Sequence, residues 1–171
     1  YLYVTSTTKT FRDHFTKMGE DLSKIFSLTK KSLAVDIGSN DGLLLKSFKN
    51  QGVRVVGVEP AENLSKISRQ NGIETLNEFF NENTVQKIIS SKGQADIVTA
   101  NNVFAHIEDI HSVAKNVKAL LKKDGVFVFE VAYLVDMFKN MTFDAIYHEH
   151  IYSYSLTPLA YFFKMQNMAI F

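Results

Sequence analysis

The sequence contains no cysteine and no tryptophan, and only two of its 171 residues are proline. Without cysteine, these residues hold neither a disulfide nor a cysteine-ligated zinc ion. No apolar run is long enough to cross a bilayer, and the first residues lack the charged-then-apolar layout of a secretory signal. The net charge of +1 provides no basic surface for nucleic acid or lipid. We therefore expect a cytoplasmic protein that binds neither nucleic acid nor a membrane.

The composition is that of a folded domain. Hydrophobic residues make up 46% of the chain and charged residues 22%, and the length suits one domain of ordinary size. Both ends look cut, because the chain begins on a tyrosine and stops in the apolar run "MAIF". We expect residues 1–171 to form a single domain of a longer protein. Residues 1–30 are expected to hold a lead-in segment and one amphipathic helix, since apolar residues recur at helical spacing in "FRDHFTKMGEDLSKIF".

Short apolar runs alternate with helical patterns along the rest of the chain. No hairpin signal separates the runs, so the pattern predicts an α/β fold with a Rossmann-like, doubly wound, mostly parallel sheet and helices on both faces. The last long run, "VFVFEVAY", has no polar residue before Glu130, which predicts a strand buried on both faces. The expected strands are 32–38, 53–60, 73–76, 95–101, 126–133 and a further one from 169. The expected helices are 43–52, 61–72, 83–93, 107–125, 134–143 and 157–168.

A glycine-rich turn follows the first expected strand. The stretch "VDIGSNDG" places Gly38 and Gly42 directly before a helix, where the backbone can approach a ligand closely. A dinucleotide-binding turn would read G-x-G-x-x-G, because a pyrophosphate needs bare backbone amides and positive potential. This turn carries Asp36 and Asp41 instead, which suit a ligand with an amine and a sulfonium. It therefore points to S-adenosylmethionine rather than NAD as cofactor, against the simpler alternative of an acidic turn that only caps a helix.

Other candidate cofactor-binding residues follow the later strands, at the carboxyl edge where open α/β sheets bind ligands. Glu59 is placed to accept hydrogen bonds from both ribose hydroxyls, a role that NAD and S-adenosylmethionine share. Phe79 and Phe80 would either stack on an adenine or pack in the core. The complete set of expected cofactor-binding residues is Asp36, Gly38, Ser39, Asn40, Asp41, Gly42, Glu59, Pro60, Phe79, Phe80, Asn101, Asn102 and Val103.

Together these motifs resemble those of the class I S-adenosylmethionine-dependent methyltransferases. The stretches "TSTTKTFRDHF", "NVFAHIED" and above all "YHEHIYSYS" are similar to the sugar C-methyltransferases that act on nucleotide-bound 4-keto deoxyhexoses. The resemblance implies S-adenosylmethionine as cofactor and a nucleotide sugar as substrate. It also implies flanking domains, an N-terminal zinc module and a C-terminal Rossmann-like domain, that these 171 residues do not include.

The stretch "DAIYHEHIYSY" concentrates two histidines, one glutamate and three tyrosines in residues 144–154. Methylation of the carbon beside a carbonyl needs a base with near-neutral pKa, donors for the enolate oxygen and a group that orients the base. Histidine suits the first role. In a strand His148 and His150 would share one face, whereas in a turn Tyr147 would meet His150. The resemblance implies His150 as the base with Tyr147 and Glu149 in the active site, and His148 is kept as a second candidate.

Three other hypotheses for the function use the same residues. His148 and His150 have the spacing of a zinc pair that His106 or His111 would complete, but methyl transfer from a sulfonium needs no metal, so we expect none. An O- or N-methyltransferase of another small molecule would use the same cofactor loops. A domain that only binds S-adenosylmethionine would not need the histidine cluster. The lack of a lysine and arginine stripe argues against a nucleic-acid methyltransferase.

Overall fold

The structure, a computed structural model, describes residues 4–147 and 149–171. Five strands form one sheet in the order β3-β2-β1-β4-β5, and each pair of neighbours is parallel. The chain winds outward from β1 to β3 and then returns to the other side of β1, which confirms the expected α/β, Rossmann-like, doubly wound sheet. The strands are β1 (Leu33–Ile37), β2 (Arg54–Val58), β3 (Thr75–Leu76), β4 (Ala95–Asn101) and β5 (Leu121–Glu130).

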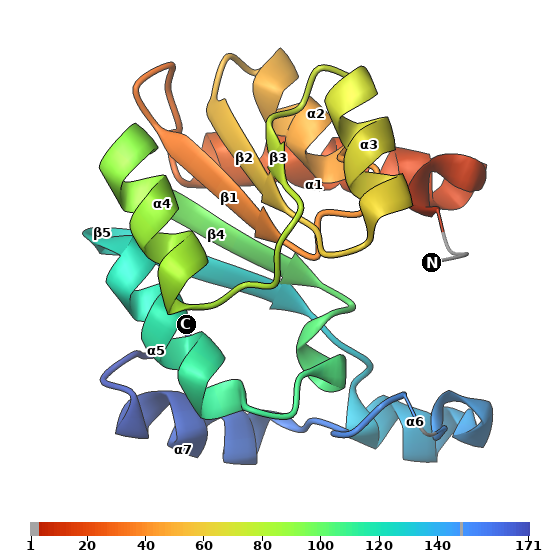
Figure 1. The fold of residues 1–171 in the computed structure, drawn as a ribbon. Coiled ribbons are helices and arrows are strands. Elements are labelled where there is room, and N and C mark those ends of the chain that lie inside the picture. The colour runs from red at the N-terminus through yellow and green to blue at the C-terminus, as the bar shows by residue number, and fades with distance from the viewer. Residues whose placement is uncertain (1–3, 148) are drawn as a thin grey trace.

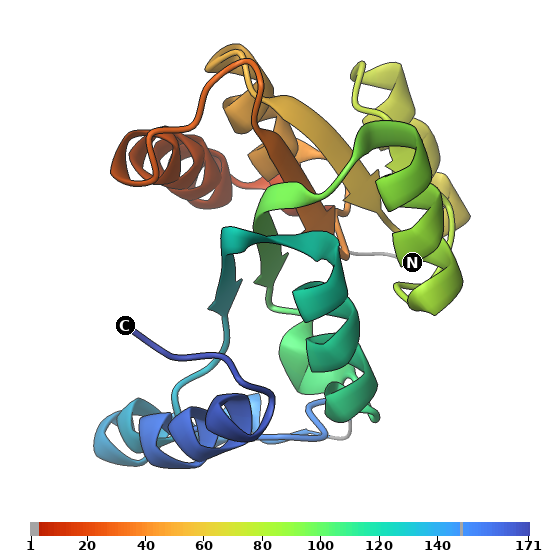
Figure 2. The ribbon, with the colours of Figure 1, turned by 90° about the vertical axis from the view of Figure 1, so that its left-hand side faces the viewer.

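Helices cover both faces of this sheet, as Figures 1 and 2 show with α1 on one side and α4 on the other. Phe15 of α1 and Phe48 of α2 are buried on one face, and Val85 of α4 and Val117 of α5 on the other. The helices are η1 (Thr5–Thr7), α1 (Lys9–Ile25), α2 (Leu43–Asn50), α3 (Glu62–Gln70), α4 (Glu82–Lys92), η2 (Phe104–His106), α5 (Ile110–Leu120), α6 (Leu134–Asn140), η3 (Phe143–Ala145) and α7 (Leu156–Met165). No helix in residues 4–147 and 149–171 is long and apolar enough to span a membrane.

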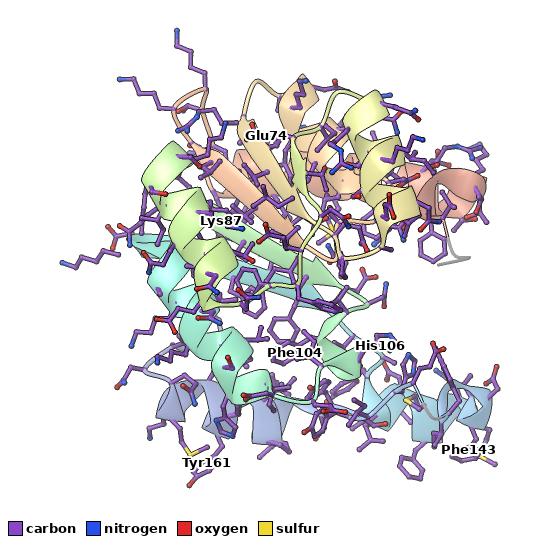
Figure 3. All side chains as sticks on the ribbon, in the orientation of Figure 1. Glu74, Lys87, Phe104, His106, Phe143 and Tyr161 are labelled. Carbon is purple, nitrogen blue, oxygen red and sulfur yellow. The ribbon has the colours of Figure 1, made fainter. Side chains whose placement is uncertain are left out.

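Phe104 is the centre of an aromatic core below the carboxyl edge of the sheet. Its side chain is fully buried, and Figure 3 shows it in the interior of the molecule. Its ring centroid lies 5.3 Å from that of Phe129 on β5 and 6.1 Å from that of Phe163 on α7. Tyr154 stacks on the same ring at 5.5 Å and donates its hydroxyl to the Phe104 carbonyl at 3.2 Å. This core fixes η2 and the segment before α7 against the sheet.

The prediction that the last strand is buried on both faces was wrong. Residues 125–130 of β5 are only half-buried, because β5 is an edge of the sheet that the described residues form. Val126 and Val128 contact the side of α1, and Phe127 and Phe129 contact the opposite core. The strand therefore has apolar neighbours on both faces but a β-strand neighbour on one side only.

Several details of the elements also differ from the predictions. The helix expected over 107–125 is α5, which begins after the N-cap Asp109 and ends at Leu120, where a bulge starts β5 and Lys122 bonds Asp96 at 2.8 Å. The helix expected over 134–143 ends at Asn140, because Met141 adopts a left-handed φ of 56°. Residues 169–171 form no strand. Ile25, expected on the apolar face of the first helix, is 68% exposed.

Candidate active site

The turn after β1 lies at the point where the strand order reverses. The backbone N–H groups of Gly38 and Ser39 both donate to the Val58 carbonyl, at 2.8 and 3.2 Å, so the turn bends over the end of β2. Gly38 has φ +65°, and a Cβ at this position would lie 2.4 Å from Cγ2 of Val103. Gly42 has φ +82° at the start of α2. Only glycine satisfies both positions without strain, which accounts for the glycine spacing of the motif.

Three buried carboxylates, those of Asp36, Asp41 and Glu59, surround the turn. None of the ion pairs formed within residues 4–147 and 149–171 includes them. The pKa of Asp36 is raised from 3.8 to about 7, chiefly by burial. The hydrogen bond from Thr99 at 2.6 Å lowers this pKa, and the nearby Glu59 carboxylate raises it. Buried acids without a basic partner favour a cationic ligand, which would restore the ionised form of Asp36.

The pocket beside these acids contains polar atoms that lack partners. Among the described residues, the buried side-chain atoms without a hydrogen bond are Ser39 Oγ, Asp41 Oδ1 and both polar atoms of the Asn101 amide. Buried polar groups are normally paired, so these atoms fit a polar ligand that supplies the missing bonds. All three residues line one pocket, together with Thr5, Phe15, Asp36, Gly38, Asn40, Leu43 and Leu44. The pocket thus brings together six of the residues expected to bind the cofactor.

Glu59 lies at the end of β2, beside the pocket. One carboxylate oxygen accepts the Asn40 N–H at 2.9 Å, and the other accepts the Ala61 N–H at 2.8 Å. A carboxylate has about four acceptor sites, so two remain for a pair of hydroxyl donors such as a ribose diol. The two backbone bonds fix the direction in which those sites face.

The structure separates the remaining expected cofactor residues. Phe79 is 75% exposed and presents its ring at the surface, whereas Phe80 packs against the core. Pro60 is exposed, and its carbonyl accepts the Asn77 amide at 2.8 Å. Asn102 has φ +54° and donates its side-chain amide to Glu130 at 3.0 Å. Phe79 therefore remains a candidate for stacking on an adenine, while the contacts of Phe80 and Asn102 are with the protein itself.

The histidine-rich stretch forms a turn rather than a strand. The His150 N–H donates to the Tyr147 carbonyl at 3.0 Å, and the Tyr147 hydroxyl lies 3.1 Å from Nε2 of His150. Of the two geometries that the sequence left open, the structure thus has the one that pairs Tyr147 with His150. Glu149 is exposed in the same turn. His148, the second candidate for the base, lies outside the described residues.

His106 is a neighbour of this turn that the sequence analysis did not select as a site residue. Its ring centroid is 4.8 Å from that of His150, and its Nδ1 is 2.7 Å from the Glu149 carbonyl oxygen. A carbonyl oxygen can only accept, so Nδ1 of His106 carries a proton and donates it to this bond. The feature of the sequence that could have identified His106 is its position just after β4, the strand beside β1, which places it at the carboxyl edge of the sheet (Figure 3). His111, the other histidine considered beside it, instead contacts Gln166 and Phe162.

Backbone bonds hold the turn at the carboxyl edge. The N–H groups of Ile151 and Tyr152 both donate to the Ala105 carbonyl, at 3.0 and 3.3 Å. Tyr133, just after β5, pairs with Tyr154 in an isolated parallel bridge, and the Leu134 N–H donates to the Tyr154 carbonyl at 2.8 Å. The bridge thus joins the two ends of the segment between Tyr133 and Tyr154, and His150 lies within that segment.

A family model described as a methyltransferase domain matches residues 11–170 of this chain. The chain belongs to the methyltransferase domain family. The family match agrees with S-adenosylmethionine, the cofactor expected from the acidic glycine turn. The expectation of a methyltransferase domain is confirmed by the same match.

Individual relatives of this methyltransferase agree with the family match. The C-methyltransferase NovU of Streptomyces niveus is 39% identical over 170 residues, which are 99% of this chain and 40% of NovU. A ubiquinone biosynthesis O-methyltransferase of Glaesserella parasuis is 32% identical over 98 residues, which are 54% of this chain and 42% of that protein. A SAM-dependent methyltransferase structure from Archaeoglobus fulgidus matches with a TM-score of 0.71 at 15% identity, covering 90% of this chain and 67% of that one. The structural match shows the shared fold, and this chain spans 40% of the length of NovU.

Proposed function

We propose that this methyltransferase domain is part of an S-adenosylmethionine-dependent C-methyltransferase that acts on a nucleotide-linked 4-keto deoxy sugar, with His150 as the base. The observation that carries the proposal is the cluster of His150, Tyr147 and His106 at the carboxyl edge of the sheet, the edge that also holds the acidic pocket. The likeness to NovU, a C-methyltransferase, over 99% of the chain supports carbon as the methyl acceptor.

The residues of the pocket suit the proposed cofactor. Asp41, Asn101 and Ser39 have buried polar atoms to offer an amino acid group, and Glu59 has acceptor sites for a ribose diol. Asp36 adds a carboxylate whose ionised form a nearby cation stabilises. When bound, S-adenosylmethionine supplies an electrophilic methyl group on a sulfonium. The protein's task is then to produce a carbon nucleophile beside it.

His150 performs that task in the proposed mechanism. A carbon next to a ketone gives up a proton to a base of near-neutral pKa, which a histidine supplies. The Tyr147 hydroxyl lies 3.1 Å from Nε2 of His150. In the tautomer in which Nε2–H donates to the Tyr147 oxygen, Nδ1 of His150 holds the lone pair that takes the proton, and the Tyr147 O–H stays available to donate to the enolate oxygen. Glu149 contributes its carbonyl oxygen, which holds His106 against the same turn. His106 then provides a second imidazole that can pass the abstracted proton on.

Proton exchange at carbon tests this proposal. The protein is incubated with a 4-keto nucleotide sugar in deuterated water without the methyl donor, and exchange at the methylated carbon is followed by NMR. We expect exchange with the wild type and none with His150→Asn. Methylation at carbon without any exchange in the wild type would contradict an enolate formed by this base.

A second candidate is methylation of a hydroxyl of another small molecule. The likeness to a ubiquinone biosynthesis O-methyltransferase over 98 residues favours it, but that match covers only 54% of the chain, against 99% for NovU. Product analysis separates the two, because a methyl group on oxygen appears without proton exchange at carbon. The same relatives are longer than this chain, so we further propose that flanking domains complete the sugar site.

A further inference from the structure

The segment Val4–Thr8, before α1, lies along the glycine turn and has no role in the function proposed above. Its Thr5 N–H donates to Oδ1 of Asn40 at 3.0 Å, and its Ser6 N–H donates to Oδ2 of Asp41 at 3.2 Å. On its other side, the Arg12 guanidinium donates to the Ser6 carbonyl at 2.7 Å and the Thr7 carbonyl at 3.1 Å. The segment is thus held between α1 and the pocket.

Asn40 is the residue that joins this segment to the pocket. It adopts φ +50°, a left-handed conformation that asparagine tolerates better than most residues. In this conformation Oδ1 accepts both the Thr5 N–H and the Asp41 N–H, the latter at 2.9 Å, while the Asn40 N–H donates to Glu59 at 2.9 Å. One side chain and one backbone group therefore connect the segment, the turn and the acid at the end of β2.

The segment also forms part of the pocket. Thr5 lines it together with Phe15 of α1, the acids Asp36 and Asp41 and the Asn101 amide. The two N–H bonds to Asn40 and Asp41 join Thr5 and Ser6 to the turn, so the position of this wall depends on them.

We infer that Asn40 is a positioning residue that holds Val4–Thr8 in place as a wall of the cofactor pocket before the cofactor binds. A segment that is already fixed adds no ordering cost to binding, whereas a released segment must be ordered when the ligand enters. Loss of the Asn40 side chain therefore weakens cofactor binding through the segment. The inference rests on the proposed cofactor site and adds to it a residue that acts through a neighbouring segment.

Asn40→Gly removes the acceptor and keeps the left-handed backbone. We expect it to bind S-adenosylhomocysteine about tenfold more weakly by calorimetry, a loss of about 1.4 kcal/mol. Hydrogen exchange of residues 4–8 should rise in this variant. Asn40→Asp keeps an acceptor oxygen at the same place, so residues 4–8 should stay protected in it. A residue that only shaped the turn would not change exchange in the segment.

Two further variants complete the experiment. Thr5→Pro removes the donor of the same hydrogen bond at the first position of η1, where proline is tolerated, and it should weaken binding and raise exchange as Asn40→Gly does. Asn167→Gly is the matched control, because exposed Asn167 also has a left-handed φ of 54° but follows α7. It should change neither measurement.

The outcomes separate the two proposals. If the wild type does not bind S-adenosylhomocysteine, the proposed cofactor site is wrong. If the wild type binds it and both Asn40→Gly and Thr5→Pro bind it within twofold of the wild type, the role of Asn40 is wrong while the site stands. If Asn40→Gly does not fold, Thr5→Pro decides by the same criterion.

Discussion

The Tyr147 hydroxyl lies 3.1 Å from Nε2 of His150, within one turn whose backbone is closed by the bond between the same two residues. The partner of the imidazole is therefore set by local geometry, while its place over the sheet is set by the distant Ala105 carbonyl. This relationship makes the turn the first target for mutation.

His150→Asn should abolish methyl transfer and leave cofactor binding unchanged. Asparagine retains polarity but does not accept a proton at neutral pH, and loss of a general base costs on the order of 10²–10⁴-fold in rate. Turnover with a 4-keto nucleotide sugar and calorimetry with S-adenosylhomocysteine measure the two effects. Tyr147→Phe is the companion variant, with a smaller loss expected. If His150→Asn kept the turnover of the wild type, another residue would have to be the base.

His106 offers a test that separates positioning from proton transfer. His106→Asn keeps a donor for the Glu149 carbonyl near the position of Nδ1, whereas His106→Ala removes it. If the ring takes part in proton transfer, both variants should lose at least about tenfold in turnover. If it only holds the turn, His106→Asn should recover most of the activity that His106→Ala loses, and the pH profile should stay unchanged.

Cofactor binding should release a proton below neutral pH because of Asp36. A cation nearby stabilises the ionised carboxylate, whose pKa in the ligand-free protein is about 7. Calorimetry at pH 6 in buffers of different ionisation enthalpy should therefore show proton release with S-adenosylmethionine, and affinity should rise as the pH approaches 7. Asp36→Asn should remove the buffer dependence; if it persists unchanged, another group titrates.

The same carboxyl should make the ligand-free protein less stable as pH rises. Between the ordinary value of 3.8 and about 7, folded Asp36 holds a proton that the unfolded chain has released. The free energy of unfolding should consequently fall across this window and level off above it. Urea unfolding of the wild type and Asp36→Asn at several pH values checks this, and parallel pH dependences in the two proteins would contradict it.

Gly38→Ala should destabilise the fold and prevent cofactor binding. The new Cβ would sit 2.4 Å from Val103 in a left-handed backbone, so both overpacking and φ strain act, at about 2–5 kcal/mol together. Gly52→Ala is the matched control, because Gly52 has φ +83° but no atom within 4 Å of the added carbon. It should lose only about 1–2 kcal/mol by urea unfolding. Equal losses would show that the Val103 contact relaxes freely.

Phe104→Ala should cost about 3–5 kcal/mol of stability, since it leaves a cavity among several aromatic rings. Its side chain is fully buried, and the rings of Phe129, Phe163 and Tyr154 surround it. Tyr161→Ala, on the exposed side of α7 in Figure 3, should stay within about 0.5 kcal/mol of the wild type. Denaturant titration compares them, and a small loss for Phe104→Ala would mean that the core collapses around the gap.

The sequence predicted the parts of this protein that depend on local chemistry. The order of strands and helices followed from the spacing of the apolar residues. Gly38, Asp36 and Asp41 were singled out because a tight turn needs glycine and a cationic ligand would suit carboxylates, and their part in cofactor binding stays a prediction. The pairing of Tyr147 with His150 was one of two geometries allowed by their spacing. The sequence could not distinguish the two geometries, because the turn is held by a hydrogen bond from the Ile151 N–H to the Ala105 carbonyl, 46 residues earlier in the chain.

What the sequence missed depends on contacts between distant residues. His106 joins the histidine turn through the Glu149 carbonyl, and no local pattern distinguishes it from a solvated loop histidine. Thr5 lines the pocket, and its N–H donates to the side chain of Asn40, 35 residues away. The end of α5 was predicted too late in the chain. Lys122 fits the helical pattern of the sequence, but in the structure it belongs to β5 and donates to Asp96, a contact that the sequence does not reveal.

The bridge between Tyr133 and Tyr154 has a consequence for how such a domain can diversify. It brings together the two ends of the loop formed by residues 134–153. Closure entropy grows only slowly with length, at about 0.6 kcal/mol per doubling, so insertions within the loop cost little. Under the proposed function, changes in the sequence of this loop can adapt the site to new acceptor molecules, while the residues of the cofactor pocket stay the same.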